Sequence, residues 1–276
     1  MKDKKTYKII IQYTESGPSS KKYKIEYSVN ANNRSDAIEE AEKAFNKYSQ
    51  NNSASWVRIL DPSAIRCWRV FPDDPNTPQF IDELIDKLPG KTPEETLSLL
   101  KRLGELEDAT ASSKVISLTK SDNNDLVVES INVLGEIGDP TVFFAVKNTY
   151  FQKKDPKIKL AVVNNLLTLA LPDDNITGFY LSAIKDPNTR EAVFNLEDAR
   201  LIPVWLPEIS KEEEFEKVKK ATLKLGNKAL EVLVSLNVNH PQVFSYASQL
   251  VKLLEPMAVE LDLNNWNKAV EKYKLL

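Results

Sequence analysis

Prolines recur in the middle of the chain at a nearly constant spacing. The interval from Pro140 to Pro172 is almost the same as that from Pro156 to Pro187. Pro156 and Pro187 each follow an aspartate. Each proline falls just before a predicted helix or in its first turn, where proline costs no hydrogen bond. A helix pair of this length cannot bury an apolar stripe by itself, so neighbouring pairs must stack. The spacing therefore predicts a helical-repeat fold.

The apolar pattern is helical from residue 80 almost to the C-terminus. Apolar side chains from Phe80 to Leu88 recur at positions i, i+1, i+4, i+5 and i+8, which is one face of a helix. Thr92, followed by Pro93 and Glu95, has the form of a helix N-terminus. Because the connections are short, consecutive helices should be antiparallel neighbours. The further predicted helices cover residues 111–121, 125–137, 141–152, 156–171, 175–185, 187–196, 211–226, 227–237, 242–254 and 264–275.

Residues 1–72 have the composition of a small α+β domain. Residues 7–13 and 23–29 are rich in β-branched and aromatic side chains, and the second run alternates apolar and polar positions, as half-buried strands do. The turn-forming residues between them predict a hairpin. A helix follows at about 37–48, and one or two strands follow within residues 56–71. The order ββαβ places one helix on one face of an antiparallel sheet.

Three prolines between Pro72 and Pro78 mark the best domain boundary in the chain, because proline fits neither a helix interior nor a central strand. Residues 1–72 carry a net charge of +5 and the remainder carries −8. Two domains with different surfaces would explain this difference, and so would an ordinary scatter of charge. We predict a mainly α protein in four parts, namely an α+β domain at 1–72, a proline-rich linker at 73–79, helical repeats at 80–200, and a helical cap or small bundle at 201–276.

The sequence from Leu126 to Pro140 resembles the second helix of a HEAT repeat, of the short type typical of phycobilin lyases. Its tail, Leu-Gly-Glu-Ile-Gly-Asp-Pro, carries the resemblance. In such a tail Gly135 allows a close helix contact, Gly138 ends the helix and Asp139 begins the next one. Two degenerate copies follow, one at residues 155–172 without the glycines and one from residue 186 that keeps a basic residue, Arg190.

The resemblance covers about residues 93–200 and implies an α-solenoid of antiparallel helix pairs. Some HEAT-repeat proteins are metal-dependent hydroxylases that use repeated His-Glu pairs. This chain has no His-Glu pair, so that activity is not expected here. The fold alone implies little about function, because one fold hosts many activities.

The chain has one cysteine, Cys67, and one histidine, His240. These counts exclude an internal disulfide, a cysteine-based zinc site and any site in one chain with two imidazoles. A Cys67–His240 nucleophilic pair would have to join the two halves of the chain, and a buried structural cysteine is the simpler interpretation. Neither a phosphate-binding glycine loop nor a nucleophile elbow is present. We therefore predict no catalytic, cofactor-binding or metal-binding residues.

Arginine and tryptophan alternate near the end of the α+β domain, with Arg66 and Trp68 on one strand face and Arg69 on the other. Such groups on an open sheet can stack bases and hold phosphates, or they form a core tryptophan with arginines at its edge. Trp205 lies in a proline-broken stretch, 201–210, predicted as a loop. It is either an exposed interface anchor or a plug for the repeat core. The predicted partner-binding residues are Trp56, Arg58, Arg66, Trp68, Arg69, Lys157, Lys159, Arg190 and Trp205.

The sequence predicts a non-catalytic protein-interaction scaffold, adaptor or assembly factor that binds a partner protein through its helical-repeat surface. One alternative is a nucleic-acid-binding protein that uses the basic N-terminal domain. Another, implied by the repeat type alone, is a phycobilin lyase or a chromophore-protein chaperone subunit. The lone thiol and the lack of any long apolar run favour a cytoplasmic location.

Overall fold

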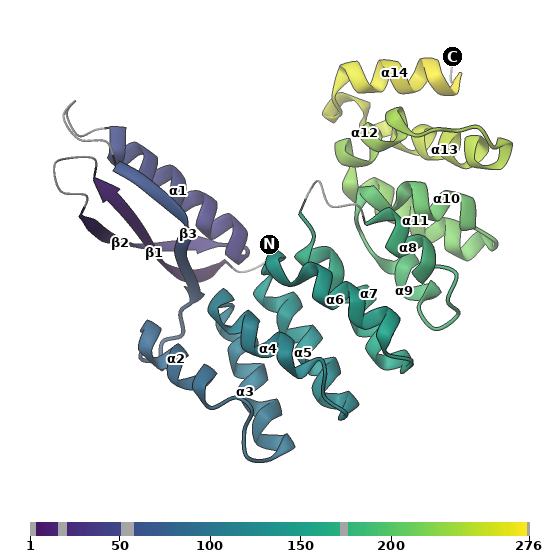
Figure 1. Cartoon of the computed structure of the whole chain (residues 1–276). Coiled ribbons are helices and arrows are strands. Elements are labelled where there is room, and N and C mark those ends of the chain that lie inside the picture. Colours follow the sequence, from purple (N-terminus) through teal and green to yellow (C-terminus); the bar gives the residue numbers. More distant parts are fainter. Residues whose placement is uncertain (1–3, 16–20, 51–57, 172–175, 275–276) are drawn as a thin grey trace. The chain divides into compact units, whose positions relative to one another are not determined.

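The computed structural model describes residues 4–15, 21–50, 58–171 and 176–274 (Figure 1). In this part, the chain forms fourteen α-helices and one antiparallel sheet. It divides into two compact units, residues 1–152 and 153–276. The predicted fold class is confirmed, because a small N-terminal α+β domain is followed by packed helices. The finer division into four parts stays a prediction.

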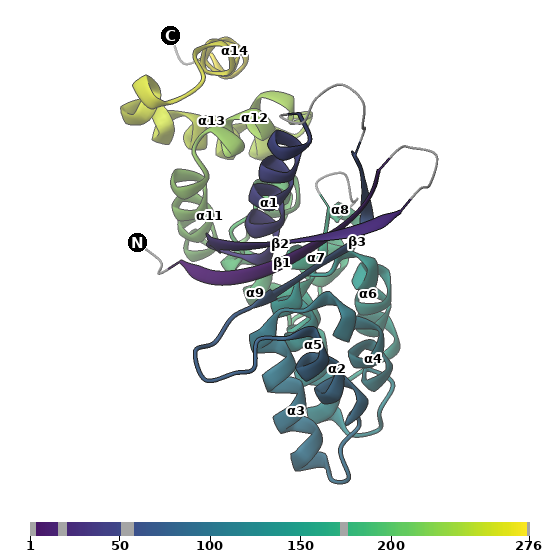
Figure 2. The same cartoon turned by 90° about the vertical axis from the view of Figure 1, so that its left-hand side faces the viewer.

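Strands β1 (Lys5–Glu15), β2 (Lys22–Ala31) and β3 (Arg58–Arg69) form the sheet in the order β2-β1-β3. Helix α1 (Arg34–Gln50) covers one face of it (Figure 2). A single strand, β3, accounts for the one or two strands predicted in that region. The core side chains come from alternate positions of β1 and from one side of α1, as the two periodicities require. They include Tyr7, Ile9, Ile11, Tyr13, Ala37, Ala41 and Phe45.

Short helices make up the rest of the first unit. They are α2 (Pro78–Asp86), α3 (Pro93–Leu106), α4 (Ser112–Leu118), α5 (Asn124–Ile137) and α6 (Phe143–Gln152). Helix α5 packs against both α3 and α4. The predicted start of α3 is confirmed, because the Thr92 hydroxyl accepts a 3.2 Å hydrogen bond from the Glu95 N–H. This cap satisfies one of the free donors of the first turn.

The connections after α3 and α5 share one geometry. Glu107 and Gly138 both have a left-handed backbone, with φ of 55° and 66°. The next residue is an aspartate in each case, Asp108 or Asp139. Its carboxylate accepts a 3.0 Å hydrogen bond from the N–H two residues later and begins a short 3-10 turn. This turn is therefore a structural mark of the repeat, and the glycine-containing tail recognised in the sequence, residues 134–140, marks only the second of the two turns.

The second unit contains eight further helices in its described part. They are α7 (Pro156–Leu169), α8 (Thr177–Ala183), α9 (Arg190–Asn195), α10 (Ile202–Glu208), α11 (Glu212–Leu225), α12 (Asn227–Ser235), α13 (Pro241–Leu254) and α14 (Leu263–Tyr273). Helix α7 packs against α9, α11 against α13, and α12 against α14. The helices thus bury their apolar sides against one another, as a stack of helices requires.

Helix α10 corrects the prediction of a loop at 201–210. Pro203 lies in the first turn of this helix, where its missing N–H has no intrahelical partner to lose. Pro207 lies in the last turn, so it removes only one intrahelical bond. The side chains of Val204, Trp205 and Leu206 between the prolines are fully buried. Their burial offsets the poor helix propensity of the two prolines.

Candidate functional site

Two arginines predicted to bind a partner are engaged within the first unit. The Arg58 Nε donates a 3.0 Å hydrogen bond to Glu15, and the Arg58 guanidinium lies 4.4 Å from the centre of the Tyr48 ring. The Arg69 guanidinium lies 4.6 Å from the centre of the Phe71 ring. An ion pair and a ring contact hold Arg58, and a ring contact holds Arg69, against the domain's own surface. Trp56, the neighbouring candidate, lies outside the described residues.

Arg66 and Trp68 lie on the sheet face opposite α1, as the alternation predicts. This face, however, meets the helices that follow. Arg66 forms an ion pair of 2.7 Å with Asp82 of α2 and one of 2.8 Å with Asp108 after α3. Trp68 is only 1% exposed. Of the two interpretations, an open stacking face is wrong and a core tryptophan with an arginine at its edge fits, because the first helices cover the sheet face that carries Trp68.

In the second unit, Lys157 is exposed at the start of α7. Lys159 donates a 2.7 Å hydrogen bond to Asp186, and this bond, together with those from Asn188, lowers the pKa of the Asp186 carboxyl to about 2. The Arg190 Nε donates a 2.8 Å hydrogen bond to Glu214. Burial opposes ionisation of Glu214, but the bonds from Arg190 and Ser210 prevail and lower its pKa to about 2. Lys159 and Arg190 therefore link elements of the fold.

Trp205 is fully buried, and its Nε1 donates a 2.9 Å hydrogen bond to the carbonyl of Val193. Of the two alternatives for Trp205, the exposed anchor is therefore wrong, and the residue fills the core of the helical unit as the second alternative held. Pro207 of the same helix is exposed and Pro203 is half-buried. Helix α10 thus presents its two prolines on a side that the core does not use.

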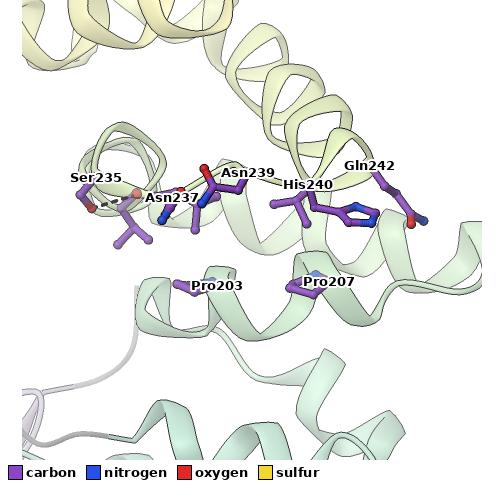
Figure 3. A pocket seen from close by; sticks show the side chains of 10 residues that line it. Pro203, Pro207, Ser235, Asn237, Asn239, His240 and Gln242 are labelled. Carbon is purple, nitrogen blue, oxygen red and sulfur yellow. Dashed lines mark hydrogen bonds between the residues drawn. The ribbon is translucent and has the colours of Figure 1, made fainter.

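A groove of about 590 Å³ lies along α10, between it and the segment that joins α12 to α13 (Figure 3). Pro203 and Pro207, one helical turn apart, line it from the α10 side. The opposite side carries polar side chains together with the apolar Val232, Leu236 and Val243. Asn237 and Asn239 come from the connecting segment, His240 precedes α13, and Gln242 lies in its first turn.

The connecting segment is held in place by α14. The Lys272 ammonium donates hydrogen bonds of 2.7 Å to the carbonyl of Val234 and 2.5 Å to that of Leu236. The Tyr273 hydroxyl donates a 2.7 Å bond to the carbonyl of Leu233. These carbonyls end α12 and would otherwise lack partners. Burial lowers the pKa of Lys272. Hydrogen bonds from α14 therefore hold the end of α12, where this wall of the groove starts.

None of the residues that line the groove is an aspartate, glutamate, lysine or arginine. His240 is the one histidine among them, and no carboxylate lines the groove beside it. Asn237, Asn239 and Gln242 can each donate and accept hydrogen bonds. The groove is thus suited to an uncharged ligand with both donors and acceptors.

The described residues contain no group of three or more side chains placed to hold a metal ion. Among those same residues, no helix combines the length and apolar character needed to cross a membrane.

No family model matches the sequence, and a search of curated proteins found no match. Similar solved structures include an engineered protein, with 15% identity, 70% of this chain and 96% of that chain covered, and a TM-score of 0.37. The archaeal HEAT-like repeats protein from Thermococcus onnurineus NA1 has 15% identity over 64% and 88% of the two chains, with a TM-score of 0.36. Human deoxyhypusine hydroxylase has 16% identity over 72% and 86%, with a TM-score of 0.30.

The groove residues were missed in the sequence, although one signal for them is present. The stretch from Val232 to Val251 contains no aspartate, glutamate, lysine or arginine, whereas 28% of the whole chain is charged. Such a run indicates that the exposed side chains of this stretch, like its buried ones, include no aspartate, glutamate, lysine or arginine. Its proximity to Pro203 and Pro207, which precede it in the sequence, follows only from the packing of α10 against α12 and α13.

Proposed function

We propose that this chain is a non-catalytic protein-interaction scaffold that holds an uncharged segment of a partner protein in the groove along α10. The observation that carries the proposal is the groove itself, a space of about 590 Å³ lined by prolines, apolar side chains and amides, with no aspartate, glutamate, lysine or arginine. Its volume lies within the roughly 300–1,000 Å³ of ordinary ligand sites. The proposed setting is the cytoplasm.

The groove is preformed, which favours binding. Fully buried Trp205 anchors α10 on its core side, and bonds from Lys272 fix the end of α12 on the other side of the groove. A site whose walls are already fixed loses little conformational entropy when a ligand binds. Proline rings supply apolar contact, and exposed amides supply hydrogen bonds at the rim, which is the usual division of a protein interface.

The nucleic-acid alternative receives less support. Arg58 and Arg66 carry cationic charge in the sheet region, and carboxylates lie within 3.0 Å of each. A phosphate would have to compete with these carboxylates for the same donors. The chromophore-lyase alternative depends on the resemblance at residues 126–140, and the sequence is its only support. A new absorbance band after mixing with a tetrapyrrole would revive it.

Co-purification from cells that natively express the chain tests the proposal. A tagged chain is compared with the Asn239→Lys variant, which places a charge in the groove, and with the Asn164→Lys variant, whose exposed residue lies on α7 outside it. We expect a stoichiometric protein partner that survives nuclease treatment, is lost with Asn239→Lys and is kept with Asn164→Lys. Equal retention by both variants would contradict the proposal, and loss on nuclease treatment would favour the nucleic-acid alternative.

A further inference from the structure

The segment between α12 and α13 has unused main-chain hydrogen-bonding groups. In the described part of the chain, no hydrogen bond involves the backbone N–H or C=O of Asn237, Val238 or Asn239. The residues at its ends are extended, with φ and ψ of −60° and 132° at Leu236 and of −100° and 129° at His240. Free main-chain donors and acceptors between two extended residues are groups with which another strand can pair.

Both ends of this segment are held by the fold. The Leu236 carbonyl accepts from Lys272, and the His240 carbonyl accepts a 3.0 Å bond from the Phe244 N–H at the start of α13. The three residues between them belong to the connection from α12 to α13. Because their ends do not need to be ordered on binding, a strand that pairs with them gains its hydrogen bonds at a low entropic cost.

The side of the groove opposite this segment has the complementary chemistry. Pro203 and Pro207 have no N–H, so α10 offers a ligand apolar rings at these positions rather than backbone donors. A ligand that lies in the groove therefore finds no main-chain donor on Pro203 or Pro207, whereas the backbone groups of residues 237–239 have no partner within the described chain. A charged ligand side chain would lose water there without meeting an opposite charge, which is costly.

We propose that the groove binds an extended, uncharged peptide segment of a partner protein whose main chain pairs with residues 237–239. An apolar side chain of that segment rests on Pro203 and Pro207. This inference rests on the proposed function and adds the conformation and charge of the bound segment. The free backbone groups of the segment and a groove lining without aspartate, glutamate, lysine or arginine carry it together.

A random dodecapeptide phage library supplies defined probes. It is selected for binding to the full chain and counter-selected against the Asn239→Lys variant. We expect the enriched peptides to lack charged residues in their central positions and to bind the Asn164→Lys variant as well as the unchanged chain. The best peptide is then synthesised with single backbone N-methyl groups at successive positions. N-methylation removes one donor from the ligand and leaves the protein unchanged, so protein folding does not affect the comparison.

Pairing as a strand predicts an alternating result. N-methylation at every second central residue should weaken binding by about tenfold, the effect expected for one lost hydrogen bond at a desolvated site, and the positions between should tolerate it. Amide hydrogen exchange should slow at residues 237–239 in the complex and stay unchanged in α7. Equal tolerance at all positions, with binding still lost in Asn239→Lys, would overturn the extended pairing and leave the groove as a binding site.

Two further outcomes would count against both proposals. Peptides that bind Asn239→Lys as well as the unchanged chain, or a library that yields no enrichment, would show that the groove does not bind a peptide segment. Self-association of the chain that is abolished by Asn239→Lys, measured by sedimentation velocity, would assign the groove to a second copy of the chain and overturn the peptide inference.

Discussion

The Tyr7 hydroxyl donates a 2.8 Å hydrogen bond to Glu107 Oε2, and this bond joins the first strand to the residue that ends α3. Lys5 donates a 2.6 Å bond to the other oxygen of the same carboxylate. Glu107 has the left-handed backbone that Gly138 has in the next repeat. Tyr7 is fully buried, and burial raises the pKa of its hydroxyl. These contacts offset the cost of a non-glycine residue in this conformation.

Tyr7→Phe should therefore destabilise the first unit. The substitution removes a buried donor to the Glu107 carboxylate. Of its two donors on β1, Glu107 then keeps only Lys5. The expected loss in free energy of unfolding is about 1–2 kcal/mol, measured by urea denaturation. Tyr23→Phe, at an exposed tyrosine of β2, is the matched control and should change stability little. Equal effects of the two substitutions would contradict the role assigned to the Tyr7–Glu107 bond.

The same contact explains why one copy of the repeat was missed in the sequence. Leu-Gly-Glu precedes the turn in both copies, from Leu103 and from Leu134. Glycine ends the helix only in the second copy, and Glu107 stands in its place in the first. Sequence rules associate a left-handed helix end with glycine. The reason that glutamate is tolerated lies in Tyr7 and Lys5, which no local pattern connects to it.

Other parts of the fold followed directly from the pattern. Alternation in 23–29 predicted strand β2, and the apolar stripe from Phe80 predicted α2, because each period matches one element. Helix α10 was missed because Pro203 and Pro207 outweigh its short apolar run in any local rule. The groove could not be predicted, since it depends on which helices pack beside α10.

Arg66→Met should lower stability rather than nucleic-acid affinity. The Arg66 guanidinium pairs with Asp108, which is 1% exposed, so removing it leaves a buried carboxylate with only its short-range partners. Breaking such a pair should lower the free energy of unfolding by about 3–5 kcal/mol. Urea denaturation measures this loss. Lys24→Met, at an exposed position of β2, is the control. A stable Arg66→Met variant that loses binding to single-stranded RNA would contradict this interpretation.

Gly226→Ala should destabilise the second unit, although an added methyl group would meet no atom within 4 Å. Gly226 joins α11 to α12 with a φ of 49° and a ψ of −117°, a conformation that costs other residues about 1–3 kcal/mol. Gly178→Ala, in α8 and equally free of contacts, has no positive φ and should be neutral or slightly stabilising. Thermal unfolding of the two variants gives the comparison, and similar shifts in both would refute the backbone explanation.

Acid should destabilise the second unit through Asp186 and Glu214. Their pKa values are about 2 in the folded chain, below the ordinary 3.8 and 4.5. Because the folded pKa values lie below the unfolded ones, this stabilisation is complete above about pH 4.5 and is lost as the pH falls towards 2. Urea denaturation across this window should show the loss. The double variant Asp186→Asn, Glu214→Gln should show a smaller pH dependence, and an unchanged slope would contradict the assignment.

The central claim is that the groove along α10 binds a partner segment. A photo-reactive amino acid at Gln242, in the groove, is compared with the same group at Asn164, outside it. After irradiation in cells that natively express the chain, we expect one defined protein to be cross-linked at residue 242 through an uncharged peptide, with no such product at residue 164. The same products from both positions, or none from residue 242, would contradict the account.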